Sequence, residues 1–493
     1  MAIAVEESGH RWRRRWPATL AVTFAVLALS ACNALVDGGS PTVSVFNDTP
    51  KQAGNDVDSR EHARIVAAYG GIFHDARVEQ TLAPIVSKIV AASDRPDQPY
   101  RITILNAPAV NAFALPDGYL YVTRGLLALA NDSSEVAAVL AHEMGHVTAN
   151  HASQRQQKAR DALVVSRVVK DVLDDDEGGR LALAASRRTL AAFSQQQELE
   201  ADAIGVKTIG RAGYDPFAAA RFLTAMQRYA NYRAQLTIQD RRPEFLSSHP
   251  ATPERVALAV KAARQFGAPG VGTTDRDRYL AGIDGMVFGD DPNQGFVRDR
   301  TFVHPGLAIG FTVPEGFVID NTSEAVLATS LDGTALRFDA VGLARDASLA
   351  DYLKSGWVNG LDESTVQSFS VNGLQAASAM ASAKGWHFRI AVIRTGGNAT
   401  YRFIFANEAV TPAFLKAASD TVDGFRTLSA SELTNFRALH IQLVTVAAGD
   451  TEAKLARRMS GVDRPLELFR LLNDLDAGSK LTPGSKLKIV SDN

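Results

Sequence analysis

The amino-acid sequence predicts a multidomain protein with three folded parts of different construction. A mainly α-helical part with a small sheet is expected over residues 61–265, an α+β part with an antiparallel sheet over 301–430, and a βααβ part over 440–493. The length of 493 residues leaves room for about three domains of roughly 150 residues each. Apolar residues follow helical spacing in the first part, whereas in the second they follow the patterns of strands. Residues 266–300 are rich in Gly, Asp and Arg and are predicted to be a linker.

The composition excludes several classes of protein. Hydrophobic residues make up 46% and charged residues 22%, which is typical of globular domains. Lys and Arg number 52 against 54 Asp and Glu, and this balance argues against a nucleic-acid-binding protein, which needs a basic excess. The single cysteine, Cys32, excludes an intrachain disulfide and a cysteine-based zinc cluster. No apolar run reaches about 18–20 residues, which argues against a multi-span membrane protein.

Residues 1–31 are predicted to be a lipoprotein signal peptide. Residues 11–15 read RWRRR, and the segment from Ala18 to Ala31 that follows is almost wholly apolar or small, as in a secretory signal. The segment leads into LSAC, so Cys32 resembles the lipidated cysteine of a bacterial lipobox. The alternatives are a plain signal with a chance cysteine, or a short membrane anchor. Residues 32–60 are predicted to be a flexible tether, because they begin with a stretch rich in Gly, Ser, Thr, Pro, Asp and Asn.

A helix with two histidines on one face is predicted after Asp132, which can cap its first turn. It contains the pentapeptide HEMGH at residues 142–146. Residues four apart lie one turn apart on the same face, so His142 and His146 can bind one metal ion, and Glu143 can lean over it. This pattern is typical of zinc proteases. The alternative interpretation is a helix with two surface histidines.

A second helical segment carries the carboxylates that such a site needs. A catalytic zinc ion takes three protein ligands and keeps a fourth position for water. Glu198 and Asp202 are four residues apart and share one face of this segment, whereas Glu200 points away from both. One carboxylate could ligate the metal, and the other could accept a hydrogen bond from a ligating imidazole and so fix its tautomer.

Five motifs follow one another between residues 60 and 265. They are NAFALPDGYLYV at 111–122, HEMGH at 142–146, ELEAD at 198–202, GYDP at 213–216 and SHPATPER at 248–255. Together they resemble the M48 family of zinc metalloproteases. That family includes bacterial periplasmic quality-control proteases and the CAAX prenyl protease type. The resemblance implies a zincin-like metalloprotease fold for this part of the chain.

The resemblance also implies a role for each matching residue. One Zn²⁺ per chain falls to His142, His146 and Glu198, and Asp202 matches a carboxylate behind the ligands. Glu143 matches the general base. In this chemistry zinc polarises the scissile carbonyl and lowers the pKa of water from about 15.7 to about 7, and the base carries the proton to the leaving amine.

Two further regions are candidates for contacts with a substrate. The resemblance places His249 near the metal, either as a contact of the substrate or transition state or, as in some members, as a removable fourth ligand. His249 is the first candidate donor to the oxyanion that forms at the carbonyl, and Asn111 is the second. The residues Ala112, Phe113 and Ala114 are strand-like, and an exposed edge there could pair with an extended substrate backbone. A plain core strand fits the same pattern equally well.

Two other features of this region are predicted to be structural. His151 follows His146 by five residues, which on a continuous helix is a turn of about 500° and puts it about 140° away from the metal face. The acidic segment DDDEGG at 174–179 is predicted to be a solvated turn between helices, in an insertion that could form a flap over the site.

The part over residues 301–430 carries no constellation of catalytic residues. Strands are predicted at Phe311–Phe317, Ala335–Leu343, His387–Arg394 and Thr400–Ala406, and helices at Ala350–Ser355 and Pro412–Phe425. The pattern GFTVPEGF at residues 310–317 resembles PsbP-like domains. The predicted role is a spacer or a module that docks a partner.

Residues 440–493 resemble a LysM domain, a family that binds the glycan chains of peptidoglycan. A strand, two helices and a strand are predicted within about fifty residues, with corners at Gly449-Asp450-Thr451 and Pro483-Gly484. The alternative is a βααβ module that binds a protein or nothing.

These features together imply a zinc-dependent endopeptidase of the bacterial cell envelope that hydrolyses unfolded or misassembled envelope proteins. The implied partners are these substrates, the membrane through a lipid on Cys32, and peptidoglycan through residues 440–493. The protein is expected to face the periplasm, and the outer membrane is favoured because Asn33 is not the Asp that resembles an inner-membrane retention signal. Two alternatives are a zinc-containing periplasmic chaperone or assembly factor with little proteolysis, and a structural lipoprotein held on the cell wall.

Overall fold

The computed structural model describes residues 56–158, 176–234, 249–396, 399–433 and 436–492. All of these residues belong to one compact unit, Thr42–Asn493. The predicted signal peptide, Cys32 and most of the predicted tether lie outside the described residues. Within the described part of the chain, no helix combines the length and the hydropathy that a membrane crossing requires.

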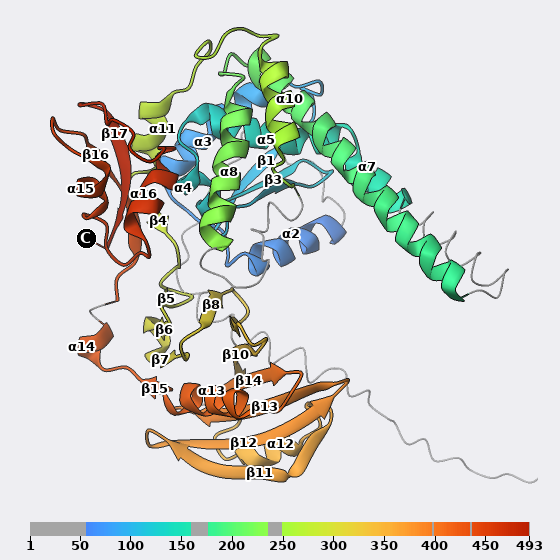
Figure 1. The fold of residues 1–493 in the computed structure, drawn as a ribbon, viewed down its shortest axis with the longest axis vertical. Helices are drawn as coiled ribbons and strands as arrows, with labels where there is room; N and C mark the ends of the chain where they lie inside the picture. The colour runs from blue at the N-terminus through green and yellow to red at the C-terminus, as the bar shows by residue number, and fades with distance from the viewer. Residues whose placement is uncertain (1–55, 159–175, 235–248, 397–398, 434–435, 493) are drawn as a thin grey trace, which may run out of the picture. The chain divides into compact units, whose positions relative to one another are not determined.

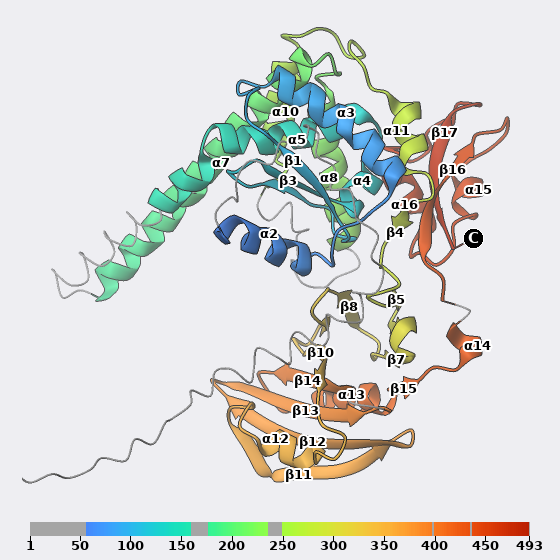
Figure 2. The ribbon, with the colours of Figure 1, turned by 180° about the vertical axis from the view of Figure 1, so that it is seen from behind.

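The first folded part packs helices against a small three-stranded sheet (Figures 1 and 2). The strand order is β1-β3-β2, with β1 parallel and β2 antiparallel to β3. The strands are β1 (Arg101–Leu105), β2 (Ala112–Ala114) and β3 (Tyr119–Thr123). The helices are α2 (Asp56–Ala68), α3 (Ala76–Ala92), α4 (Arg124–Leu129), α5 (Ser133–Thr148), α7 (Asp176–Arg211), α8 (Ala218–Ala234) and α10 (Pro253–Ala263). Helix α5 packs on α3, α7, α8 and β2, and so forms the centre of this part.

Helix α5 is buried along almost its whole length, and its two ends follow from local chemistry. Asp132 caps the first turn by accepting a hydrogen bond from the backbone N–H of Glu135. The Glu135 side chain reaches back and accepts from the N–H of Asn131. The helix ends at Thr148, because Asn150 has a φ of +56°, a left-handed conformation that asparagine tolerates. The chain becomes helical again at residues 151–158, so the helix predicted to continue past His146 is broken.

Helices α5 and α7 approach closely where each carries a glycine. A Cβ atom at Gly145 would lie 3.2 Å from the backbone oxygen of Ala201, and one at Gly205 would lie 3.2 Å from the backbone nitrogen of His142. A side chain at either position would push the two backbones apart, whereas glycine lets them meet. This crossing brings the carboxylates of α7 beside the histidines of α5. Helix α7 also includes residues 176–179, which were predicted to lie in an acidic turn.

The second part is built on an antiparallel sheet of seven strands, in the order β11-β12-β13-β14-β10-β9-β8. Helix α13 covers one face of this sheet and helix α12 covers the other. Successive residues of a strand point to opposite faces, so neighbouring residues pack against different helices. Thus Ala391 and Ile393 pack in the cluster with α13, and Ile390 and Val392 in the cluster with α12. The elements are β8 (Phe317–Asn321), β9 (Val326–Ser330), β10 (Ala335–Gly342), α12 (Leu349–Lys354), β11 (Leu361–Val371), β12 (Leu374–Ala383), β13 (Trp386–Arg394), β14 (Ala399–Asn407) and α13 (Pro412–Asp423).

A four-stranded sheet in the order β15-β7-β6-β5 adjoins this part. The strand predicted at Phe311–Phe317 is two strands instead, because Pro314 and Gly316, with a φ of +87°, form a turn between β7 and β8. The elements are β5 (Phe296–Arg298), β6 (Thr301–His304), η2 (Pro305–Leu307), β7 (Ile309–Thr312), β15 (Arg426–Thr427) and α14 (Ala430–Leu433). The predicted combination of a mainly helical part and an antiparallel-sheet part is confirmed.

The C-terminal residues follow the order strand, helix, helix, strand. The elements are β16 (Leu439–Thr445), α15 (Glu452–Ala456), α16 (Pro465–Leu472) and β17 (Lys486–Ser491), with β16 and β17 antiparallel. A third strand, β4 (Val287–Phe288), joins β16 from the segment predicted to be a linker. That segment also contains helix α11 (Arg276–Ile283), whose Tyr279 and Leu280 are fully buried. One hydrophobic core runs through the first part, α11 and the C-terminal elements.

Candidate metal centre

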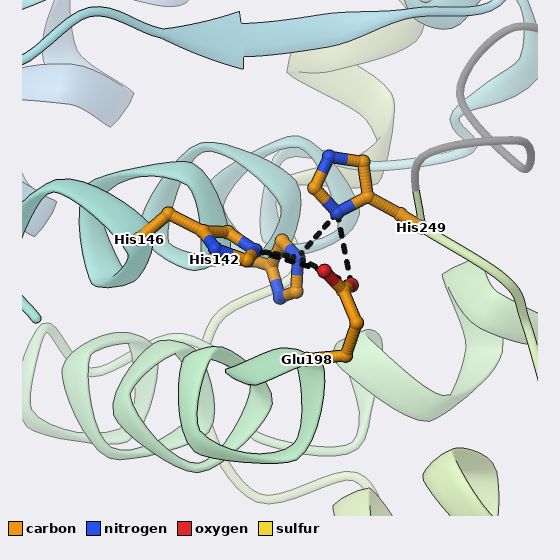
Figure 3. Close-up of side chains that lie close together, drawn as sticks. All are labelled: His142, His146, Glu198 and His249. Atoms are coloured by element: carbon orange, nitrogen blue, oxygen red, sulfur yellow. Dashed lines mark hydrogen bonds and ion pairs between the residues drawn. The ribbon is translucent and has the colours of Figure 1, made fainter. Parts of the chain in front are cut away.

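Four buried side chains converge on one point between α5, α7 and the start of α10 (Figure 3). His142 and His146 come from α5, Glu198 comes from α7, and His249 comes from the segment that precedes α10. One nitrogen or oxygen atom of each lies within 4.8 Å of the others. Because His142 and His146 are one helical turn apart, the helix alone places their rings side by side.

The facing atoms of this group lie at short distances. Nε2 of His142 is 3.1 Å from Nε2 of His146 and 3.3 Å from Nδ1 of His249. Glu198 faces all three rings. Its Oε2 is 2.9 Å from Nδ1 of His249 and 3.5 Å from Nε2 of His142, and its Oε1 is 3.4 Å from Nε2 of His146.

The donor set fits a metal ion. Imidazole nitrogens and a carboxylate oxygen are the ligands that Zn²⁺ prefers in proteins. Oε1 of Glu198 is buried and has no hydrogen-bond partner among the described residues, whereas buried polar atoms usually have one. A cation between the four side chains would supply that missing partner.

Burial and the neighbouring charges shift the pKa values of the site residues in different directions. Burial would lower the pKa of His142, but the carboxylates of Asp202 and Glu198 outweigh it and raise the pKa to about 9. Burial, assisted by the neighbouring His142, lowers the pKa of His146 well below its usual range, so the His146 ring is neutral and keeps a free lone pair. Burial would raise the pKa of Glu198, but His142 and His249 hold it well below its usual range. The site therefore presents a carboxylate and a neutral imidazole to whatever it holds.

Asp202 and Arg255 form a buried layer behind these ligands. Oδ1 of Asp202 is 2.9 Å from Nδ1 of His142, on the side of the ring that faces away from the cluster. Arg255 donates to both oxygens of Asp202, at 2.7 Å each, and its Nη1 is 3.0 Å from Oε2 of Glu198. Arg255 lies in the motif SHPATPER, but neither that pattern nor the family resemblance predicted a role for it. The sequence did contain a signal for this role, because Arg255 follows by two residues the Pro that begins α10 and lies in the same motif as the predicted site residue His249.

His151 is the second residue whose place in the site was not predicted from the sequence. It is fully buried, and its Nδ1 is 2.8 Å from Nδ1 of His146. Its Nε2 is 3.3 Å from Oε2 of Glu200. The angle of about 140° predicted between His151 and the metal face holds only for a continuous helix. The helix is broken at Asn150, so that prediction was wrong. Asn150, a residue that often ends helices, was the available signal.

The remaining candidate side chains lie at different distances from the cluster. Oε1 of Glu143 is buried, has no hydrogen-bond partner among the described residues, and is 3.7 Å from Nε2 of His249. Burial raises the pKa of Glu143. Asn111 is buried and donates from Nδ2 to the hydroxyl of Tyr69 at 2.9 Å, so one of its two amide hydrogens is already engaged.

Strand β2, which holds Ala112, Phe113 and Ala114, lies at the edge of its sheet. Leu115 and Asn111, on either side of it, bond to β3 through the N–H of Leu115 and the C=O of Asn111. Because bonded and non-bonded pairs alternate in an antiparallel ladder, the N–H and C=O groups of Ala112 and Ala114 point away from β3. Phe113 stacks on a ring of β3, with 4.8 Å between the ring centroids.

Comparison with known proteins identifies this part of the chain. Residues 76–263 match Peptidase family M48. The chain is 30% identical over 219 residues to the beta-barrel assembly-enhancing protease of Escherichia coli (strain K12), covering 43% of this chain and 44% of that protein. It is 30% identical over 163 residues to the mitochondrial metalloendopeptidase OMA1 of Arabidopsis thaliana, covering 33% and 31%. The chain thus matches less than half the length of each of these two relatives.

A likeness to one solved structure is weaker. Cyanobacterial PsbP from Synechocystis sp. PCC 6803 aligns at 12% identity and a TM-score of 0.21, covering 28% of this chain and 98% of that one. A TM-score of this size does not assign a fold. The family match spans all four converging side chains, three from helices α5 and α7 and His249 from the segment before α10. Residues 76–263 therefore form a domain of peptidase family M48 around a site that could hold one metal ion.

Proposed function

We propose that this protein is a zinc-dependent endopeptidase. The observation that carries the proposal is the buried convergence of His142, His146, Glu198 and His249, with the carboxylate of Glu143 beside them. We assign zinc to His142, His146 and Glu198. The family match and the names of the two relatives, both proteases, support this assignment.

Each residue of the chain has a separate task in the proposed reaction. When bound, zinc supplies a Lewis acid that polarises the scissile carbonyl and lowers the pKa of water from about 15.7 to about 7. Glu143 takes the proton of the attacking water and gives it to the leaving amine. Its burial, which raises its pKa, makes it a stronger base than an exposed carboxylate. The carboxylate of Asp202, 2.9 Å from Nδ1 of His142, favours the tautomer with the proton on Nδ1 and so keeps Nε2 free for the metal.

His249 is proposed to be a removable fourth ligand. A catalytic zinc site needs one position open to water and substrate. Nδ1 of His249 lies inside the ligand cluster, which favours the ligand role over a permanent contact with substrate. Nε2 of the same ring lies on the side of Glu143, where a hydrogen-bond donor to the oxyanion is needed.

The substrate is proposed to bind in an extended form along β2. The outward N–H and C=O groups of Ala112 and Ala114 can form a short ladder with a peptide backbone, which requires an unfolded or extended substrate. Recognition through the backbone tolerates many sequences. Misassembled envelope proteins fit this requirement, and the relative named as a beta-barrel assembly-enhancing protease supports such a substrate class.

The proposal includes an envelope location. The basic and apolar segments before Cys32 support export and a lipid anchor on that cysteine, facing the periplasm, with the outer membrane favoured by Asn33. The βααβ order of the C-terminal elements supports a LysM-like module that binds peptidoglycan. We expect the full chain to sediment with isolated peptidoglycan and to be released by soluble glycan fragments. A chain that stays in the supernatant would remove this part of the proposal.

The variant Glu143→Gln tests the catalytic proposal, because it removes the base and keeps all proposed ligands. We expect unchanged binding of one zinc per chain and a loss of about 10²–10⁴-fold in the rate of casein cleavage, the usual contribution of general acid–base catalysis. Glu254→Gln, at an exposed carboxylate that bonds to Gln195, is the matched control. Cleavage by Glu143→Gln at the wild-type rate would remove Glu143 from the mechanism. A wild type that binds zinc and cleaves no denatured protein would favour the chaperone alternative.

A further inference from the structure

His146 contacts a second imidazole on the side that faces away from the proposed metal. Its Nε2 faces His142 and Glu198, whereas its Nδ1 is hydrogen-bonded to Nδ1 of His151 at 2.8 Å. His151 is fully buried and is hydrogen-bonded through Nε2 to Oε2 of Glu200 at 3.3 Å. The Glu200 side chain is 57% exposed, so this row of groups runs from the ligand cluster to solvent.

The two hydrogen bonds allow one consistent placement of the protons. A ligating nitrogen must carry a lone pair, so Nε2 of His146 is bare and its proton lies on Nδ1. That N–H donates to Nδ1 of His151, which must therefore be bare as well. The proton of His151 then lies on Nε2 and points at the carboxylate of Glu200. The other assignment, with Nδ1 of His146 bare, would place a proton where the metal binds.

We infer that His151 and Glu200 are positioning residues that hold His146 in its zinc-binding tautomer and orientation; the inference rests on the function proposed above. His142 receives the same support directly from a carboxylate, because Asp202 lies 2.9 Å from its Nδ1. For His146 the supporting carboxylate is that of Glu200, and the ring of His151 lies between the two. Second layers of this kind usually contribute 10–100-fold to metal affinity.

The local fold holds His151 in place. The helix break at Asn150 turns the following residues back toward α5, which brings the His151 ring onto His146 with 4.9 Å between centroids and 74° between planes. Gln197 of α7 donates to the backbone oxygen of His151 at 3.3 Å and to Gln154 at 3.2 Å. The ring is thus fixed from the backbone side as well.

Zinc affinity of the full chain, measured by competition with a chromogenic chelator, tests the inference. His151→Leu removes the acceptor for Nδ1–H of His146, and we expect affinity to fall by about 10–100-fold. His151→Gln offers a side-chain oxygen as a substitute acceptor, and we expect it to regain most of the loss. Glu200→Gln, at an exposed position, should weaken zinc binding by about 10-fold, at the lower end of that range. Glu254→Gln is the matched control for removal of one nearby carboxylate, and we expect no change.

The outcomes separate this inference from the proposed function. Wild-type protein that binds no zinc would overturn the proposed function itself. Wild-type protein that binds zinc, with unchanged affinity in His151→Leu and Glu200→Gln, would overturn the inference alone. If His151→Leu does not fold, Glu200→Gln decides the question, because an exposed carboxylate can be replaced without loss of the core. Thermal unfolding of the zinc-free forms detects a purely structural role: a lower melting temperature with unchanged zinc affinity would also overturn the inference.

Discussion

Arg255 connects two carboxylates of the metal centre. Its guanidinium makes a two-pronged contact with Asp202 and a third contact with Glu198, and all three side chains are at least nine-tenths buried. Arginine suits this place because its planar fork matches the two oxygens of one carboxylate. The positive charge offsets the two negative charges of Glu198 and Asp202, which lie one turn apart on the same face of α7 and would otherwise repel each other. Arg255 therefore sets the orientation of one proposed ligand and of the group that orients another.

Arg255→Lys tests whether the fork or the charge is needed. The variant keeps a positive charge but loses the two-pronged geometry, and Asp202 loses at least one hydrogen bond. We expect zinc affinity to fall by at least about 10-fold. We also expect the free energy of unfolding to fall by about 1–3 kcal/mol, as when a buried acceptor loses its hydrogen-bond donor. Chelator competition and denaturant unfolding measure the two effects, with the exposed Arg264→Lys at the other end of α10 as control. Wild-type zinc affinity in Arg255→Lys would show that charge alone is sufficient.

At the scale of elements, the crossing of α5 and α7 determines where the proposed ligands meet. Spacing along one helix places His142 beside His146, but Glu198 reaches them only because the two backbones come close at Gly145 and Gly205. A glycine in a helix usually lowers stability by about 1 kcal/mol relative to alanine. Glycine nevertheless occurs on both helices at this crossing, because a Cβ atom at either position would be too close to the facing backbone.

Gly205→Ala tests the role of this crossing. A Cβ atom at this position would lie 3.2 Å from the backbone nitrogen of His142, so α5 and α7 must separate by a few tenths of an ångström. The gain in helix propensity of about 1 kcal/mol offsets only part of the overpacking cost of about 1–3 kcal/mol. We therefore expect a small change in the free energy of unfolding but a clear loss of zinc affinity and of casein cleavage. Gly145→Ala, on the facing helix, should act in the same direction. A variant that gains stability and keeps full activity would contradict this account of the crossing.

At the scale of the whole molecule, the C-terminal strand β17 completes the domain that carries the metal centre. Lys488 is fully buried, and its ammonium donates to the backbone oxygens of Ala128, Leu129 and Ala130 at 2.7–3.2 Å. These oxygens belong to the end of α4 and the turn that leads into α5, where a helix leaves carbonyl groups without partners. Arg276 of α11 adds a hydrogen bond to the oxygen of Asn131 in the same turn. The start of the histidine helix is thus held by groups from α11 and β17.

Lys488→Met tests this dependence. Methionine fills a similar volume but removes the ammonium that donates to the oxygens of Ala128 and Ala130, whereas the oxygen of Leu129 still accepts from the Asn131 amide at 3.3 Å. A buried carbonyl oxygen left unpaired usually costs about 1–3 kcal/mol. We expect the free energy of unfolding to fall by several kcal/mol, and hydrogen exchange at residues 128–135 to become faster. Lys486→Met, two residues earlier on β17 and exposed, is the matched control and should behave as the wild type. Equal unfolding midpoints for the two variants would mean that β17 does not support α4 and α5.

The sequence by itself determined the local features of this protein. The spacing of His142 and His146 and the helix cap at Asp132 follow from contacts between residues close in the chain, and so do the strands β10, β13 and β14. Such contacts repeat with the period of the helix or strand, and this repetition is legible in one sequence. Family resemblance added the distant Glu198 and His249, which the structure places beside the two histidines.

Only the tertiary structure decided which distant groups meet behind and around the site. The contacts that Arg255, His151, Glu200 and Lys488 make have no periodicity in the sequence. Arg255, His151 and Lys488 are also buried, although charged or polar side chains are normally exposed. The segment 266–300 shows the same limit, because its Gly, Asp and Arg content resembles a linker while Tyr279 and Leu280 lie in the common core. A long-range contact depends on how whole elements pack, and packing depends on all of their side chains together.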